Sequence, residues 1–120
     1  MSSSSTFRPH ERIRRRLEFQ RVHERGTRLS GRFMTALFLA NDLPYDRLGI
    51  IASRRLGGAV QRNRAKRLIR EIFRLNKRTI RATGSDIVII PRADLVKAPF
   101  PAVEADYRGI LQRHGKRARS

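Results

Sequence analysis

The sequence predicts a single domain of mixed α/β class. Three segments have the apolar content and turn boundaries of strands, and three have helical periodicity. The expected strands are residues 30–40, 47–53 and 86–92, and the expected helices are residues 10–25, 59–74 and 100–113. A chain of 120 residues can bury one core, and the sequence contains no internal repeat that would indicate a second unit.

The first helix segment carries apolar residues at loosely helical spacing: Ile13, Leu17 and Val22. Gly26 follows this segment, and glycine commonly ends a helix. Phe19 lies off the apolar stripe, so periodicity alone does not place its ring in the core.

Each strand segment is apolar and is bounded by turn residues. Residues 30–40 (SGRFMTALFLA) form one long strand-like run, and a turn containing Pro44 separates it from residues 47–53 (RLGIIAS). Residues 86–92 (DIVIIPR) are apolar without alternation, so we expect both faces of this strand to be covered.

Residues 59–74 (AVQRNRAKRLIREIFR) divide into two faces when they are placed at 100° steps around a helix. The apolar arc, which we expect to be buried, contains Ala65, Leu68, Ile69, Ile72, Phe73 and Leu75. The adjoining arc, which we expect to be exposed, contains Arg62, Lys66, Arg70, Arg74 and Lys77, with Asn63 and Arg67 beside them. The pair Gly57-Gly58 precedes the helix and can supply its N-cap.

The domain is expected to span residues 10–114. Its last helix, over about 100–113, presents Val103, Tyr107, Ile110 and Leu111 on one face. Residues 1–9 are rich in Ser and Arg, and we interpret them as a disordered tail because no long amphipathic stretch typical of a transit peptide is present. Residues 115–120 are predicted to be a mobile basic tail.

Charge is the strongest compositional signal. Lys and Arg number 28 against 10 Asp and Glu, which gives a net charge of +18. Self-repulsion of this size opposes compaction, and a polyanionic partner is the usual explanation. Arg greatly outnumbers Lys, and its planar fork suits phosphate, which favours nucleic acid. The chain has no Cys, and no apolar run approaches the length of a membrane span, so disulfides, thiolate metal sites and a membrane partner are not expected.

The cationic arc of residues 59–74 is either an ordinary solvated face or a surface for a polyanion. Solvated faces normally interleave acidic residues at i, i+4, which offsets repulsion. Here Arg62, Lys66, Arg70 and Arg74 repeat like charge at that spacing. The pattern therefore favours polyanion binding, and Glu71 is interpreted as an intrahelical partner for Arg67 or Arg74.

Residues 47–74 (RLGIIASRRLGGAVQRNRAKRLIREIFR) resemble the signature region of the protein subunit of bacterial ribonuclease P. The core of the match is Arg62-Asn63-Arg64, then Lys66-Arg67, then Arg70-Glu71, preceded by Arg54-Arg55 and Gly57. The resemblance extends over roughly residues 11–113 and includes the early helix with Phe19.

The resemblance implies a fold that periodicity does not provide. It implies a small mixed sheet with helices in the order αβββαβα, a left-handed βαβ crossover, and a likeness to domain 2 of ribosomal protein S5. The usual crossover is right-handed. The residue patterns give three strands, so a fourth is expected either from a division of residues 27–40 or from a short edge piece.

The resemblance also implies a function. A protein of this family binds a catalytic RNA subunit and the 5′ leader of precursor tRNA, and the complex removes the leader in the cytoplasm. The catalytic centre is expected in the RNA, with magnesium serving the RNA-catalysed reaction and no metal, cofactor or small-molecule substrate assigned to this chain. Its ten acidic residues are scattered, and no pair has the spacing of a metal site.

The resemblance assigns site residues. RNA contacts are expected from Arg54, Arg55, Arg62, Asn63, Arg64, Lys66, Arg67 and Arg70, and a leader-binding cleft is expected to use Phe19 and His23. His23 stands where the family commonly has a second aromatic residue.

Each assignment has a simpler alternative. Phe19 is either a stacking platform for a single strand or a core residue. Arg64 contacts RNA or a neighbouring loop, and Asn63 bonds to RNA or to the preceding loop. Arg54-Arg55, with the turn at Gly57-Gly58, form either an anion site or an exposed turn.

The charge by itself is equally compatible with another class of protein, a structural RNA-binding protein such as a ribosomal protein. The ordered motif and the Phe19 helix favour the ribonuclease P assignment, because a generic basic protein has no reason to carry both.

Overall fold

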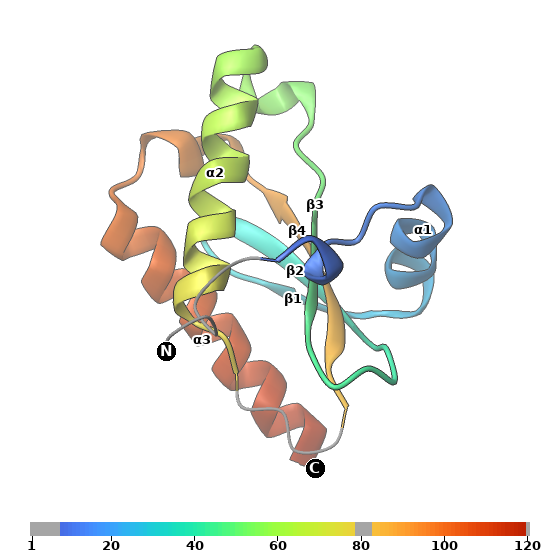
Figure 1. The fold of residues 1–120 in the computed structure, drawn as a ribbon. Helices are drawn as coiled ribbons and strands as arrows, with labels where there is room; N and C mark the ends of the chain where they lie inside the picture. The colour runs from blue at the N-terminus through green and yellow to red at the C-terminus, as the bar shows by residue number, and fades with distance from the viewer. Residues whose placement is uncertain (1–7, 79–82, 120) are drawn as a thin grey trace.

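The computed structural model describes residues 8–78 and 83–119, with side chains up to residue 116. Its helices and strands are α1 (Arg16–Arg25), β1 (Thr27–Ser30), β2 (Met34–Ala40), β3 (Arg47–Ile50), α2 (Ala59–Leu75), β4 (Ser85–Pro91) and α3 (Phe100–Arg119) (Figure 1). Short 3-10 helices are η2 (Pro9–Glu11), η3 (Arg54–Leu56) and η4 (Ala93–Lys97). The predicted order αβββαβα is confirmed. Residues 1–7 of the predicted tail, and Ser120, lie outside the described residues.

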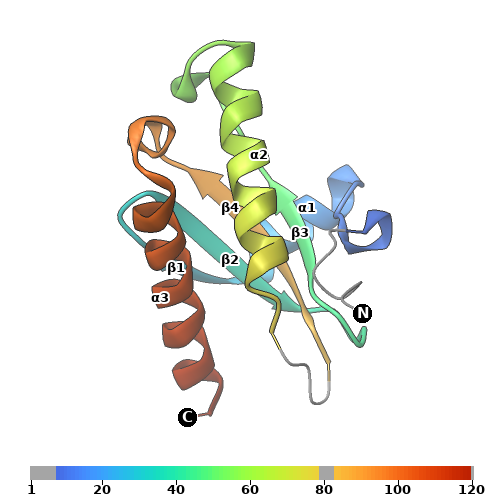
Figure 2. The same ribbon diagram turned by 60° about the vertical axis from the view of Figure 1, so that its left-hand side comes forward.

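One mixed sheet has the strand order β1-β2-β4-β3. β2 is antiparallel to both β1 and β4, while β3 runs parallel to β4. Figure 2 shows α2 in front of the sheet, with β3 and β4 both running upward and β4 to the left of β3. The β3–α2–β4 crossover is therefore left-handed, against the usual rule.

The prediction of one strand over residues 30–40 is wrong, because the chain turns between Ser30 and Met34. The Asp106 carboxylate of α3 accepts the backbone N–H groups of Arg32 and Phe33, both at 2.9 Å, and holds the turn. Gly31 is required there, since a Cβ at this position would lie 2.4 Å from Asp106 Oδ1. The division supplies the expected fourth strand.

The two faces of the sheet are covered differently. α2 and α3 lie on one face, over the larger apolar cluster, and α1 lies on the other (Figure 1). The smaller cluster under α1 consists of buried Ile13, Val22, Leu37 and Val88, with half-buried Phe19, Leu39 and Ile90 beside them. As predicted, β4 is covered on both faces.

Several predicted boundaries are corrected. The first helix begins at Arg16 and not at residue 10, because Ile13 N–H donates to Leu48 O at 2.9 Å and draws the preceding backbone alongside β3. Leu17 is consequently 73 % exposed and is not a core residue. Leu75, at the end of α2, is also exposed, and β3 ends at Ile50. α3 continues to Arg119, so the backbone of the predicted basic tail is helical up to that residue.

Candidate nucleic-acid interface

α2 presents the two faces that its sequence predicts. Gly57 has a φ of 122°, which favours glycine, and Gly58 is the N-cap from which the helix starts. The buried side chains are Ala65, Ile69, Ile72 and Phe73, while Leu68 is half-buried. Asn63, Arg64 and Arg67 are exposed, and Arg62, Lys66 and Arg70 are half-buried.

The cations of α2 are not equivalent. Glu71 accepts hydrogen bonds from Arg74, the shorter-range partner of the two predicted, with Arg74 Nε at 3.0 Å from Glu71 Oε1. This contact lowers the pKa of Glu71 and raises that of Arg74. In the described part of the chain, by contrast, the side chains of Asn63 and Arg64 form no hydrogen bond or ion pair. The predicted loop contacts of these two residues are therefore not formed in the free protein.

A cavity of about 160 Å³ joins α2 to the α1 side of the sheet. Its lining consists of Arg12, Ile13, Phe19, Leu48, Gly49, Ile50, Lys66 and Arg70. Burial, and secondarily the charge of Arg12, lower the pKa of Arg70. Cations are thus held close together at the rim of an apolar hollow, an arrangement that a bound anion would stabilise.

The Phe19 ring lies directly over Gly49 of β3. A Cβ at position 49 would lie 2.5 Å from Phe19 Cε1, so the ring can take this place only because the residue is glycine. Phe19 is half-buried: it packs beside the small cluster under α1 and also lines the cavity. His23 is exposed one turn further along α1 and does not line this cavity.

A second, larger hollow of about 510 Å³ lies on the same side of the sheet as Phe19. It is lined by Arg28, Thr35, Ser53, Arg55, Ile90, Pro91, Arg92 and Ala93. Arg55 is thus placed against the sheet face, whereas Arg54 is exposed without lining either hollow. The N–H of Gly57 already donates to Arg54 O at 3.0 Å, so it is not available to an anion at this turn.

Comparison with known proteins identifies the family. The Ribonuclease P family model matches residues 7–115. The ribonuclease P protein component of Syntrophobacter fumaroxidans is 49 % identical over 92 residues, covering 77 % of both chains. That of Thermotoga petrophila is 42 % identical over 114 residues, covering 92 % of this chain and 97 % of the relative. This chain belongs to the ribonuclease P protein family.

Solved structures of the ribonuclease P protein family share the fold. The RNase P protein from Thermotoga maritima superposes with a TM-score of 0.75 at 37 % identity, over 86 % of this chain and 96 % of that one. The Staphylococcus aureus protein gives a TM-score of 0.75 at 28 % identity, over 87 % and 94 % of the two chains. As a ribonuclease P protein component, the chain is part of a ribonucleoprotein endoribonuclease that processes tRNA, with its catalytic centre in the RNA.

The ribonuclease P motif indicates Lys66, Arg70 and Phe19 but misses the other cations that line the hollows, Arg12, Arg28 and Arg92. Arg28 alternates with buried Leu29 on β1, and this signal becomes visible only once residues 27–30 are recognised as a strand. Arg92 directly follows Pro91, the last residue of β4. Arg12 reaches its place through the long-range bridge to Leu48, which no local pattern predicts.

The residues that the structure describes offer neither a metal site nor a membrane span. Within these ranges no group of three or more His, Asp or Glu side chains could hold a metal ion. The same residues contain no helix with both the length and the apolar character needed to cross a membrane.

Proposed function

We propose that residues 10–114 form a single RNA-binding domain that joins the catalytic RNA subunit of ribonuclease P to the 5′ leader of precursor tRNA in the cytoplasm. The protein assists removal of the leader and supplies no catalytic group of its own. Magnesium serves the RNA-catalysed reaction.

The cavity beside Phe19 carries this proposal. A single strand is held without sequence selection by an aromatic platform for its bases and cations for its phosphates. Phe19 over Gly49 offers the platform, and Lys66 and Arg70 from α2 offer the cations at the same cavity. The larger hollow, with Arg28, Arg55 and Arg92, extends this path along the sheet. His23, on the exposed side of α1, contributes at the outer end of the leader path.

The exposed face of α2 is assigned to the RNA subunit. Arg62, Asn63, Arg64 and Arg67 project from one side of a helix whose other side is fixed in the core, so their positions are set by the fold. Contacts with phosphates position an RNA without reading its sequence, which suits a structured partner. Arg54 lies in η3, next to the start of the same helix, and extends this surface.

The test is reconstitution with the cognate RNA subunit at low magnesium, comparing precursor tRNA that carries a several-nucleotide leader with mature tRNA. The holoenzyme is expected to bind the precursor more tightly. Phe19→Ala should reduce that preference, since stacking on one ring contributes about 1–3 kcal/mol per base. Leu17→Ala is the matched control, because Leu17 lies on the same helix and is 73 % exposed.

Equal binding of precursor and mature tRNA by the unsubstituted holoenzyme would contradict the leader assignment. If the protein changed neither cleavage nor affinity for the precursor, the rival function of a structural RNA-binding protein would be favoured instead.

A further inference from the structure

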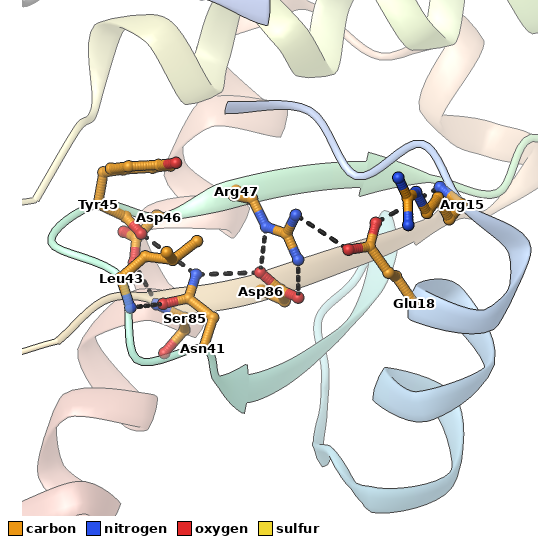
Figure 3. Close-up of polar contacts among 9 residues, drawn as sticks. All are labelled: Arg15, Glu18, Asn41, Leu43, Tyr45, Asp46, Arg47, Ser85 and Asp86. Atoms are coloured by element: carbon orange, nitrogen blue, oxygen red, sulfur yellow. Dashed lines mark hydrogen bonds and ion pairs between the residues drawn. The ribbon is translucent and has the colours of Figure 1, made fainter. Parts of the chain in front are cut away.

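Arg47 links the sheet to α1 on the face where Phe19 lies (Figure 3). Its Nε and Nη2 atoms donate to the two carboxylate oxygens of Asp86 at 2.8 and 2.7 Å, and its Nη1 donates to Glu18 Oε2 at 3.2 Å. The Arg47 side chain is 18 % exposed and that of Asp86 9 %, so water screens this pair less than an ordinary surface pair. One guanidinium therefore contacts β4 and α1 at once.

The direction of the guanidinium is set by the sheet and not by α1. Asn41 Nδ2 donates to Asp86 Oδ1 at 3.0 Å and to the backbone oxygen of Tyr45 at 3.2 Å, while Asn41 Oδ1 accepts the N–H of Leu43 at 2.9 Å (Figure 3). The Asp86 carboxylate is thus held by the β2–β3 turn as well as by its own strand. A bidentate pair fixes the plane of Arg47, and its remaining N–H groups face Glu18.

The contact with Glu18 lies next to the Phe19 platform in both segments. Glu18 and Phe19 are consecutive residues in the first turn of α1. Arg47 and Gly49 are two residues apart on β3, and alternation places them on the same face of the sheet. The first turn of α1 is therefore held at two neighbouring points: Glu18 to Arg47, and the Phe19 ring to Gly49.

The remaining anchoring of α1 is slight. Val22 is its one fully buried side chain, and Leu17 is exposed. The helix and the segment before it are rich in arginine, in a chain whose net charge of +18 repels further cations. The Glu18 carboxylate is the group of this helix that the structure pairs with a sheet cation.

We propose that Arg47, held by Asp86, is a positioning residue that fixes α1 through Glu18 and thereby sets the place of the Phe19 ring over Gly49. The inference rests on the proposed role of Phe19 in leader binding. It assigns to Arg47 no contact with RNA: the residue acts through Glu18 and the helix.

The test uses the reconstituted holoenzyme and the ratio of its affinities for leader-bearing precursor and mature tRNA. Replacing Arg47 would leave the buried Asp86 carboxylate without its cation and unfold the site, so the substitution is made at Glu18. Glu18→Gln should reduce the ratio about twofold to fivefold, the range expected for loss of a partly exposed ion pair. Glu24→Gln is the matched control, with the same charge change on the exposed side of the same helix, and should leave the ratio unchanged.

A double variant separates positioning from a general loss of structure. If Glu18 acts through Phe19, then Glu18→Gln should have little further effect on the ratio in a protein that already carries Phe19→Ala. Affinity for the RNA subunit should be the same in all four proteins of this cycle. An additive effect of the two substitutions, or an equal effect of Glu24→Gln, would overturn the positioning role.

The two proposals fail in different ways. If Phe19→Ala itself leaves the ratio unchanged, the leader cleft of the proposed function is wrong. If Phe19→Ala reduces the ratio while Glu18→Gln does not, the cleft stands and the positioning inference is wrong.

Discussion

The two faces of the sheet are completed to different degrees. α2, α3 and η4 close one face over a continuous apolar cluster that includes fully buried Ile69, Ile72, Val103 and Tyr107. The other face has the short helix α1 and a small cluster in which Phe19, Leu39 and Ile90 are half-buried. Both hollows that carry the proposed leader path lie on this second side.

This difference separates stability from binding. Apolar burial is the main stabilising term in a small domain, and it is concentrated on the closed face. The open face keeps part of its apolar surface accessible and surrounds it with arginines, which destabilises the free protein slightly and leaves room for an anionic strand. Residues on the two faces should therefore respond differently to the same chemical change.

The largest contrast is expected from Val103→Ala and Val22→Ala. Both side chains are 0 % exposed, so the two substitutions remove the same buried atoms. Val103→Ala should cost about 2–3 kcal/mol, because the surrounding helices and sheet cannot collapse into the cavity. Val22→Ala should cost roughly 1 kcal/mol, because half-buried Phe19 and Leu39 can move toward the space. Denaturant unfolding measures both, and equal costs would mean that the two faces are equally rigid.

The second contrast is between stability and RNA assembly on α2. Arg62→Gln combined with Arg67→Gln should leave the unfolding midpoint nearly unchanged, since neither residue belongs to the core. Affinity for the RNA subunit should fall, and the log–log salt slope should become shallower by roughly 0.7–0.9 for each phosphate that the variant no longer neutralises. Arg108→Gln, which removes one positive charge from the exposed side of α3, is the control. A nearly flat salt dependence of the unsubstituted protein would contradict the electrostatic account.

The closed face can be predicted from the sequence much better than the open one. The apolar residues of α2 recur with helical period because one side of that helix meets the sheet, so the pattern alone indicates Ala65, Ile69 and Ile72. The α1 side depends on contacts between distant residues. The sequence pattern places Leu17 in the core because the extended segment beside Leu48, which delays the start of the helix, has no local signal.

The candidate site shows the same limit. Motif resemblance predicts Lys66, Arg70 and Phe19, but their meeting at one cavity is a consequence of the β3–α2 connection. Arg28 and Arg92 are not predicted at all, because their common hollow forms only when β1, β2 and β4 pair. Arg47 is recognisable as part of a strand, and its contact with Glu18 requires the helix to lie across the sheet.

The smallest and most local effect is expected from Gly49→Ala. The added Cβ would lie 2.5 Å from Phe19 Cε1 and 3.2 Å from Ile13 Cβ, so the ring must shift. Because Phe19 is half-buried, it can rotate toward solvent at a cost of about 1 kcal/mol, the lower end for overpacking. The preference for leader-bearing precursor should then decrease by a small factor while affinity for the RNA subunit is maintained. Gly109→Ala on α3, where nothing lies within 4 Å, should leave that preference intact and stabilise the helix by about 0.5–1 kcal/mol. An unchanged preference in Gly49→Ala would show that the ring need not lie on β3 to hold the leader.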